Sequence, residues 1–149
     1  MTIMEKVLAL HEVDLFEHMG TEDLSILAAI TEEDQFDKGD KLFSENEPAD
    51  SLSLIISGKV LVLKDSREIF VAGPGDALGA LSMLEGDPWL FSGEVREPTE
   101  ILRIDRETFL DVIADHPSII EAILRSLVRK VRRLVNTPVS GPSGETENR

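Results

Sequence analysis

One stretch, residues 73–95, holds the residue types and the spacing that could bind an anion. Three glycines lie at its start (Gly73, Gly75 and Gly79), and a short apolar run follows at residues 80–84. A glycine-rich turn that leads into a helix leaves unpaired backbone N–H groups at the helix start, and such groups bind phosphate. The spacing therefore indicates a phosphate-binding turn, and the N–H groups of residues 79–81 are where an anion would bind.

Catalytic and metal chemistry find less support in the sequence. His11, Asp14 and His18 would share a face if one helix carried all three, which is one way to build a metal site. Surface histidines beside acids are far more common, so we expect no metal. The acids are spread over helix starts and turns, where they cap helices and increase solubility. Because none of them is grouped with glycines and a histidine in a loop, we expect no catalytic residue and no enzyme.

The overall charge limits the partners of the chain. The 149 residues include 29 acids and 15 Lys or Arg, a net charge of −14, and no cysteine. Such a surface repels nucleic acid and anionic membranes, so we expect direct contact with neither. The sequence has no apolar run of the ~18–20 residues that span a bilayer and no basic start typical of a signal peptide, so we expect a cytoplasmic protein.

Short strands are expected between residues 34 and 104, where apolar or alternating segments are separated by turn signals. That spacing is typical of an antiparallel sandwich, barrel or roll. The expected strands are 34–37, 41–44, 51–57, 59–63, 68–71, 92–95 and 100–104. Gly58 would form a tight hairpin turn between the strands on either side of it, and a short helix at residues 78–85 would interrupt the strands.

Helices are expected before and after the strands. Apolar clusters lie within residues 2–19, and Thr21, followed by acids, is expected to begin a capping box for a helix at 22–31. Asp105 can cap a helix at 106–114, and Pro117 suits the first turn of a longer helix at 118–135. We therefore expect one domain, residues 1–135, with the strands at about 33–104. Residues 136–149 are rich in Gly, Pro, Ser and Thr and are expected to form a flexible tail.

The last helix carries an apolar seam and a basic face. Five residues repeat at heptad spacing: Ile120, Leu124, Leu127, Val131 and Leu134. This seam could pack on its own domain or form a homodimer. Five basic residues between positions 125 and 133 avoid the seam, so they either face solvent or dock on an acidic partner, which includes the acidic strands of the same chain.

The order of the elements and several short segments resemble the cyclic-nucleotide-binding domain family, as in the ligand module of catabolite-activator-like proteins. The resemblance covers roughly residues 10–135. It rests on residues 36–40 (FDKGD), 54–60 (LIISGKV) and 75–79 (GDALG), the last of which leads into the family's phosphate-binding cassette. It implies a mainly β fold, an antiparallel β-roll with N-terminal helices, a short cassette helix and a long C-terminal helix. Members of the catabolite-activator type dimerise through that last helix.

The resemblance also implies a ligand site, and there the match is partial. In the family, an aromatic residue, Gly and Glu precede a short apolar helix, and Pro, Arg, two small residues and a hydroxyl residue close the cassette. The matching positions hold Gly79, Leu81, Ser82, Pro88 and Ser92. Ala80 replaces the Glu that accepts from the ribose hydroxyl, Trp89 replaces the Arg that pairs with the phosphate, and the bulky Leu90 replaces a small residue.

Loss of the Glu and the Arg decides what the site is expected to bind. Each charge-assisted hydrogen bond contributes about 1.5–3 kcal/mol, so losing both costs ~3–6 kcal/mol, or ~2–4 decades of affinity. We therefore expect a non-enzymatic regulatory module that needs no cofactor and does not bind cyclic AMP or cyclic GMP with ordinary affinity. It would act through its last helix on a second copy or on a protein partner.

Two alternatives stay open at this point. The chain could be a true sensor of a cyclic nucleotide, or of another small anionic ligand, with non-standard contacts in which Arg67 or Arg96 supplies the missing positive charge. The apolar triplet at residues 89–91 has two interpretations as well. Its side chains would either belong to the sheet core or fill the vacated ligand cavity, which would otherwise lower stability in proportion to its volume.

Overall fold

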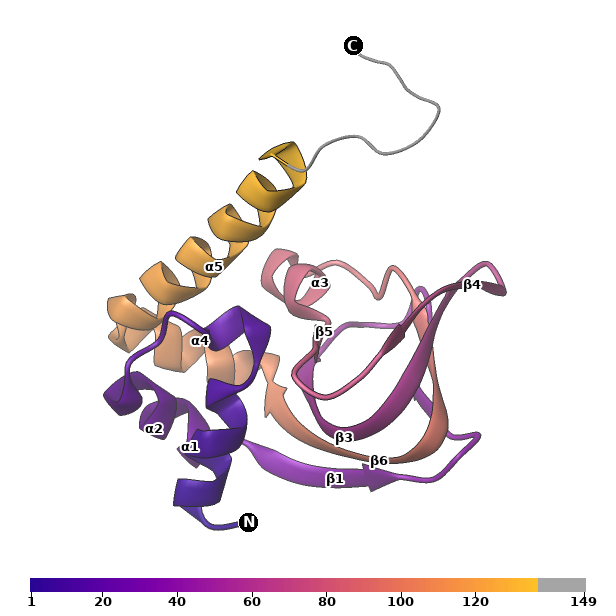
Figure 1. Ribbon diagram of the computed structural model, residues 1–149, viewed down its shortest axis with the longest axis horizontal. Helices are drawn as coiled ribbons and strands as arrows, with labels where there is room; N and C mark the ends of the chain where they lie inside the picture. The colour runs from indigo at the N-terminus through magenta and orange to yellow at the C-terminus, as the bar shows by residue number, and fades with distance from the viewer. Residues whose placement is uncertain (137–149) are drawn as a thin grey trace.

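Two long antiparallel strands, β3 (Ser51–Lys64) and β6 (Ser92–Asp105), form the middle of the sheet. β1 (Glu32–Phe36) lies on the far side of β6 and β4 (Arg67–Ala72) on the far side of β3, so the strand order is β1-β6-β3-β4. In this computed structural model, which describes residues 1–136, the strands curl into a roll (Figure 1). The antiparallel β-roll expected from the sequence is confirmed.

Two short strands complete the roll. β2 (Lys41–Phe43) pairs with β6, and β5 (Ala77–Leu78) pairs with β3. β5 is joined to α3 (Ala80–Glu85), which lies between the roll and the last helix (Figure 1). The helix predicted at residues 78–85 therefore begins two residues later than expected, because residues 77 and 78 pair with Ser53 and Leu54 as a strand.

The hairpin turn predicted at Gly58 is wrong. Residues 51–64 form one continuous strand, and residues 92–105, also predicted as two strands, form its long partner. Gly58 has φ +101°, and the pairing of β3 with β6 shifts register around it. A Cβ at Gly58 would come within 2.6 Å of Pro98 O on β6. Gly58 thus lies in a β-bulge, which bends β3 against β6. The local sequence does not distinguish a glycine in a bulge from a glycine in a turn.

Three short helical segments precede the sheet: α1 (Ile3–His11), the 3-10 helix η1 (Asp14–Phe16) and α2 (Thr21–Ala29). The capping box predicted at Thr21 is wrong, because Gly20 is the N-cap and Thr21 is already helical. A capping box does occur at the start of α1, where the Thr2 hydroxyl accepts from the Glu5 N–H and the Glu5 carboxylate accepts from the Thr2 N–H. α1 ends at His11 and η1 begins at Asp14, so no single helix carries the three residues that the sequence offered as a metal site.

Two helices follow the sheet. α4 (Arg106–Asp115) begins after Asp105, which is its N-cap as predicted, although the Asp105 side chain makes no capping hydrogen bond. α5 (Pro117–Asn136) is longer and extends away from the roll (Figure 1). Asn136 ends α5 and so does not belong to the predicted tail, whose other residues, 137–149, lie outside the described part of the chain. No helix within residues 1–136 is long and apolar enough to cross a membrane.

Two apolar clusters hold these elements together. One joins α1, η1, α2, α4 and the start of α5 to one end of β3 and β6, and its largest fully buried side chains include Phe16 and Phe109. The other fills the inside of the roll and contains Phe43 and Trp89. The cassette segment lies between the two clusters, because Leu78 packs in the second cluster and Met83 in the first. Its position therefore depends on both halves of the domain.

Candidate functional site

α3 begins and ends at glycines, and its last turn is tied to α4. Gly79 is the N-cap of α3 with φ +96°, and Gly86 ends the helix with φ +78°, so both ends use the left-handed conformation that glycine adopts without strain. The Gly79 carbonyl accepts from the Met83 N–H at 2.9 Å. Arg106 Nε donates to Met83 O at 2.7 Å, which links the last turn of α3 to α4.

The indole of Trp89 lies inside the roll beside the start of α3. It stacks on Phe43 of β2, with ring centroids 3.9 Å apart and ring planes 14° from parallel. A Cβ placed on Gly79 would lie 2.4 Å from Trp89 Cη2, so the ring is in close contact with the cassette backbone. The Trp89 backbone is held as well, since its N–H donates to Glu47 O and its carbonyl accepts from the Asn46 N–H. Of the predicted triplet, Trp89 belongs to the core of the roll, whereas Leu90 is half exposed.

A cavity of about 300 Å³ remains between β5, α3 and α5. Trp89 therefore does not fill the whole space next to the cassette. Apolar side chains make up most of its wall, and among the described residues that line it Lys130 is the one with a charge. The full lining is Leu15, Phe43, Val62, Phe70, Ala77, Leu78, Gly79, Ala80, Leu81, Ser82, Trp89, Leu90, Phe91, Leu127 and Lys130.

The cavity brings together most, but not all, of the site residues that the sequence predicts. The lining includes Gly79, Ala80, Leu81, Ser82, Trp89 and Leu90, whereas Pro88 and Ser92 are not part of it. Pro88 instead forms an isolated antiparallel β-bridge with Pro48. The Ser92 hydroxyl already accepts a hydrogen bond of 3.0 Å from the Glu45 N–H. Ser92 therefore has a structural partner in its own chain.

Sequence reasoning missed the contribution of α5 to this cavity. Leu127 and Lys130 lie one turn apart on α5, and both line the wall. The two arginines considered as replacements for the missing positive charge are not in the wall, and Arg96 pairs with Glu68 at 3.3 Å on the surface. The sequence presents Lys130 only as part of a basic run, because nothing in the local sequence indicates that this run passes the cassette.

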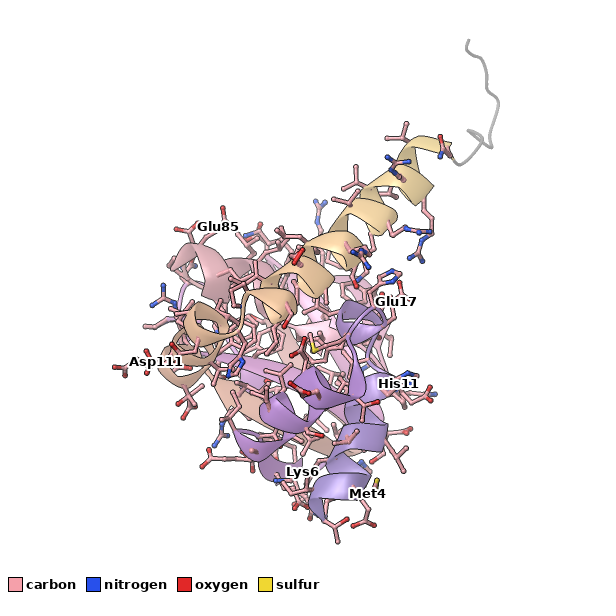
Figure 2. The ribbon with its side chains drawn as sticks, turned by 90° about the vertical axis from the view of Figure 1, so that its left-hand side faces the viewer. Met4, Lys6, His11, Glu17, Glu85 and Asp111 are labelled. Atoms are coloured by element: carbon pink, nitrogen blue, oxygen red, sulfur yellow. The ribbon has the colours of Figure 1, made fainter. Side chains whose placement is uncertain are left out.

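The basic face of α5 contacts the acidic N-terminal part of the same chain. Lys130 Nζ lies 2.8 Å from Asp14 Oδ2, and Arg133 lies 3.4 Å from Glu17 Oε1. Figure 2 shows Glu17 next to α5, and Glu85 at the end of α3 lies on the other side of α5. These two residues thus contact acids of the N-terminal segment rather than the acidic strands named in the sequence prediction, and their side chains stay partly exposed to solvent.

α5 uses a different face for its own domain than the heptad spacing suggests. Ile119, Ala122, Ile123 and Ser126 are buried against the domain. In the predicted seam, Leu127 lines the cavity, while Ile120, Leu124, Val131 and Leu134 are exposed. Most of the seam is therefore an unpaired apolar stripe on the outside of α5.

Comparison with known proteins identifies the fold and its usual context. The sequence model of the family described as "Cyclic nucleotide-binding domain" matches residues 33–116. The chain is 38% identical over 120 residues to a CRP-like cAMP-activated global transcriptional regulator of Mycobacterium tuberculosis, which covers 75% of this chain and 54% of that protein. The chain thus spans about half the length of this curated relative.

Two further matches place the same domain in different proteins. The N-terminal domain of a transcriptional regulator from Streptomyces coelicolor A3(2) aligns with a TM-score of 0.76 and 25% identity, over 89% of this chain and 99% of that chain. An uncharacterized NTE family protein of Mycobacterium bovis is 28% identical over 126 residues, which is 84% of this chain but 22% of that protein. The domain is therefore combined with different neighbouring segments in its relatives.

Proposed function

The chain belongs to the cyclic nucleotide-binding domain family, and we propose that it is a regulatory module that holds cyclic AMP and cyclic GMP more weakly than is ordinary for that family. The observation that carries the proposal is the indole of Trp89, which lies against Gly79 and Phe43 where the family's cassette has an arginine. Ala80, next in the cassette, offers no acceptor to a ribose hydroxyl. An anionic sugar phosphate would meet one cation in the wall, Lys130, among mostly apolar side chains.

The proposed output of the module is α5. A ligand in the cavity would touch this helix directly, because Leu127 and Lys130 belong to both. The exposed apolar stripe on the outer face of α5 offers a surface to a second copy of the chain or to a protein partner. Burying such a stripe against a partner is favourable in proportion to its apolar area.

The relatives widen the range of candidate partners beyond the sequence expectation. The relative from Mycobacterium tuberculosis is named a transcriptional regulator, and this chain spans about half of it. The expectation that the chain makes no direct contact with nucleic acid therefore gains no support from the comparisons. That expectation, the absence of enzyme activity and the cytoplasmic location stay predictions.

Titration with cyclic nucleotides tests the proposal. The melting temperature and the emission of Trp89, the one tryptophan in the sequence, are recorded with micromolar and then millimolar cyclic AMP or cyclic GMP. Ligand at ~100 times its dissociation constant stabilises the folded state by about 2.7 kcal/mol, a shift of several degrees for a domain of this size. We expect neither signal to move at micromolar nucleotide. A shift of both signals at that concentration would overturn the proposal and favour a true cyclic-nucleotide sensor.

A further inference from the structure

We propose that the cavity between β5, α3 and α5 binds a small, mostly apolar molecule that carries one anionic group, of the class of aromatic carboxylates, and that Lys130 pairs with its anion. The inference rests on the proposed function, because it names the kind of ligand that this altered cassette accepts in place of a cyclic nucleotide.

The size and the lining of the cavity point to an apolar ligand body. A volume of about 300 Å³ lies at the lower end of small-molecule pockets. Phe43, Phe70 and Trp89 offer aromatic surface, and Leu78 and Leu127 add aliphatic surface. A ribose and a phosphate would leave several polar groups without partners here, which is costly, whereas an aromatic ring system has no such groups to satisfy.

The charge at the cavity points to a single anionic group. Lys130 is the one charged side chain among the described lining residues, so an anion there meets a cation and no lining carboxylate. Lys130 already pairs with Asp14 at 2.8 Å, and both side chains are about two-fifths exposed. An exposed ion pair of this kind contributes little to stability, so Lys130 can exchange Asp14 for a ligand carboxylate at small cost.

The same exchange would connect the ligand to α5. Asp14 lies on η1, so the Lys130–Asp14 pair links α5 to the N-terminal helices. A ligand that draws Lys130 toward the cavity releases this link and adds contacts to Leu127, one turn earlier on the same helix. The contacts of α5 therefore differ between the ligand-bound and the ligand-free protein. Such a difference is required for a ligand to shift a helix from one position to another.

Calorimetric titration of the full chain with three matched probes tests the inference. The probes are 2-naphthoate, its neutral isostere 2-naphthamide, and cyclic AMP. We expect naphthoate to bind about tenfold or more tightly than naphthamide, which is the contribution of one charge-assisted hydrogen bond. Naphthoate should also change the emission of Trp89, which lies in the cavity wall. Equal binding of the two naphthalene probes, or no naphthoate binding, would overturn the inference.

Paired variants assign the charge to Lys130. Lys130→Met should reduce the preference for naphthoate over naphthamide to less than about threefold, because the apolar body still fits but the cation is gone. Arg129→Met is the matched control, since Arg129 is the neighbouring cation on α5 and does not line the cavity. It should keep the full preference. An unchanged preference in Lys130→Met, or an equal loss in Arg129→Met, would contradict the assignment. Lys130→Gln replaces Lys130→Met if the latter shows altered circular dichroism.

The cyclic AMP arm separates failure of this inference from failure of the proposed function. Micromolar binding of cyclic AMP would overturn the proposed function whatever the naphthalene probes do. Absence of both cyclic AMP and naphthoate binding would overturn the inference alone. A third variant, Ala80→Phe, places a ring in the cavity wall and should abolish naphthoate binding in an otherwise folded protein, because Ala80 lines the cavity. Unchanged naphthoate affinity in Ala80→Phe would show that the probe binds elsewhere and would overturn the inference.

Discussion

Trp89 and Phe43 stack face to face with ring centroids 3.9 Å apart, and this stack joins the end of the cassette to β2. Both side chains are buried, with 8% and 7% of their surface exposed. The position that would hold a phosphate-pairing arginine in the family therefore contributes to the core of the roll. Under the proposed function, stability and ligand choice depend on the same side chain, and substitutions can separate the two roles.

Trp89→Ala should lower the free energy of unfolding by about 3–5 kcal/mol, as for other large aromatic side chains removed from a core. Leu90→Ala is the control, because Leu90 is its neighbour but half exposed, and it should cost less than about 1.5 kcal/mol. Urea unfolding followed by circular dichroism measures both, since Trp89→Ala removes the fluorescent reporter. Similar losses for the two variants would show that the stack with Phe43 does not stabilise the roll.

Ala80→Glu combined with Trp89→Arg should raise the affinity for cyclic AMP by about tenfold or more, because it restores an acceptor and a cation at the cassette positions. The Arg keeps a favourable contact with the Phe43 ring through its planar guanidinium. Ala80→Gln combined with Trp89→Met is the control of similar size without charge, and it should gain much less. Calorimetric titration compares them. If the charged pair gains no more than the neutral pair, the missing charges do not explain weak nucleotide binding.

Gly58→Ala should lower the free energy of unfolding by about 3 kcal/mol or more. The substitution combines a left-handed backbone, φ +101°, with a Cβ only 2.6 Å from Pro98 O. Gly39→Ala is a close match, because Gly39 has φ +94° but no atom within 4 Å of its Cβ position, so it should cost about 1–2 kcal/mol. Thermal and urea unfolding measure the difference. If the two variants lower the free energy of unfolding equally, β6 moves aside to accommodate the new Cβ, and Gly58 is needed only for its positive φ.

If two copies pair through the outer stripe of α5, as proposed, Leu124→Glu with Val131→Glu should convert that dimer to a monomer, because the two side chains are 54% and 58% exposed on the stripe. Their exposure also predicts little change in the stability of the monomer. Sedimentation at two protein concentrations measures the oligomeric state. Arg132→Glu, an exposed change on the same helix outside the predicted seam, should leave the dimer intact. A wild-type chain that sediments as a monomer at both concentrations would rule out this use of the stripe.

The cassette shows which features can be predicted from the local sequence. Gly79 and the short apolar run after it predict a turn and a helix, and the helix begins two residues later than expected because residues 77 and 78 pair with β3 as β5. The resemblance to the family, with Ala80 and Trp89 at the matching positions, predicts that the family's acceptor and cation are missing. What the sequence could not predict is the indole stacked on Phe43, since the two residues are far apart in the chain and their contact depends on how the roll closes.

The sequence by itself determined that helices precede and follow a region of short antiparallel strands, because this follows from residue types and short spacings. The choice of a roll, and the expectation that ligand-binding residues are missing from the cassette, came from the resemblance of short segments to the cyclic nucleotide-binding domain family. The tertiary structure decided the rest. Gly58 is a bulge because its strand pairs along its whole length with β6, where a hairpin turn would have reversed it. α5 buries Ile119 and Ile123 and leaves most of its heptad seam exposed, because packing on the N-terminal helices selects the face. Lys130 reaches the cassette for the same reason, since the path of α5 across the domain is set by contacts between distant residues.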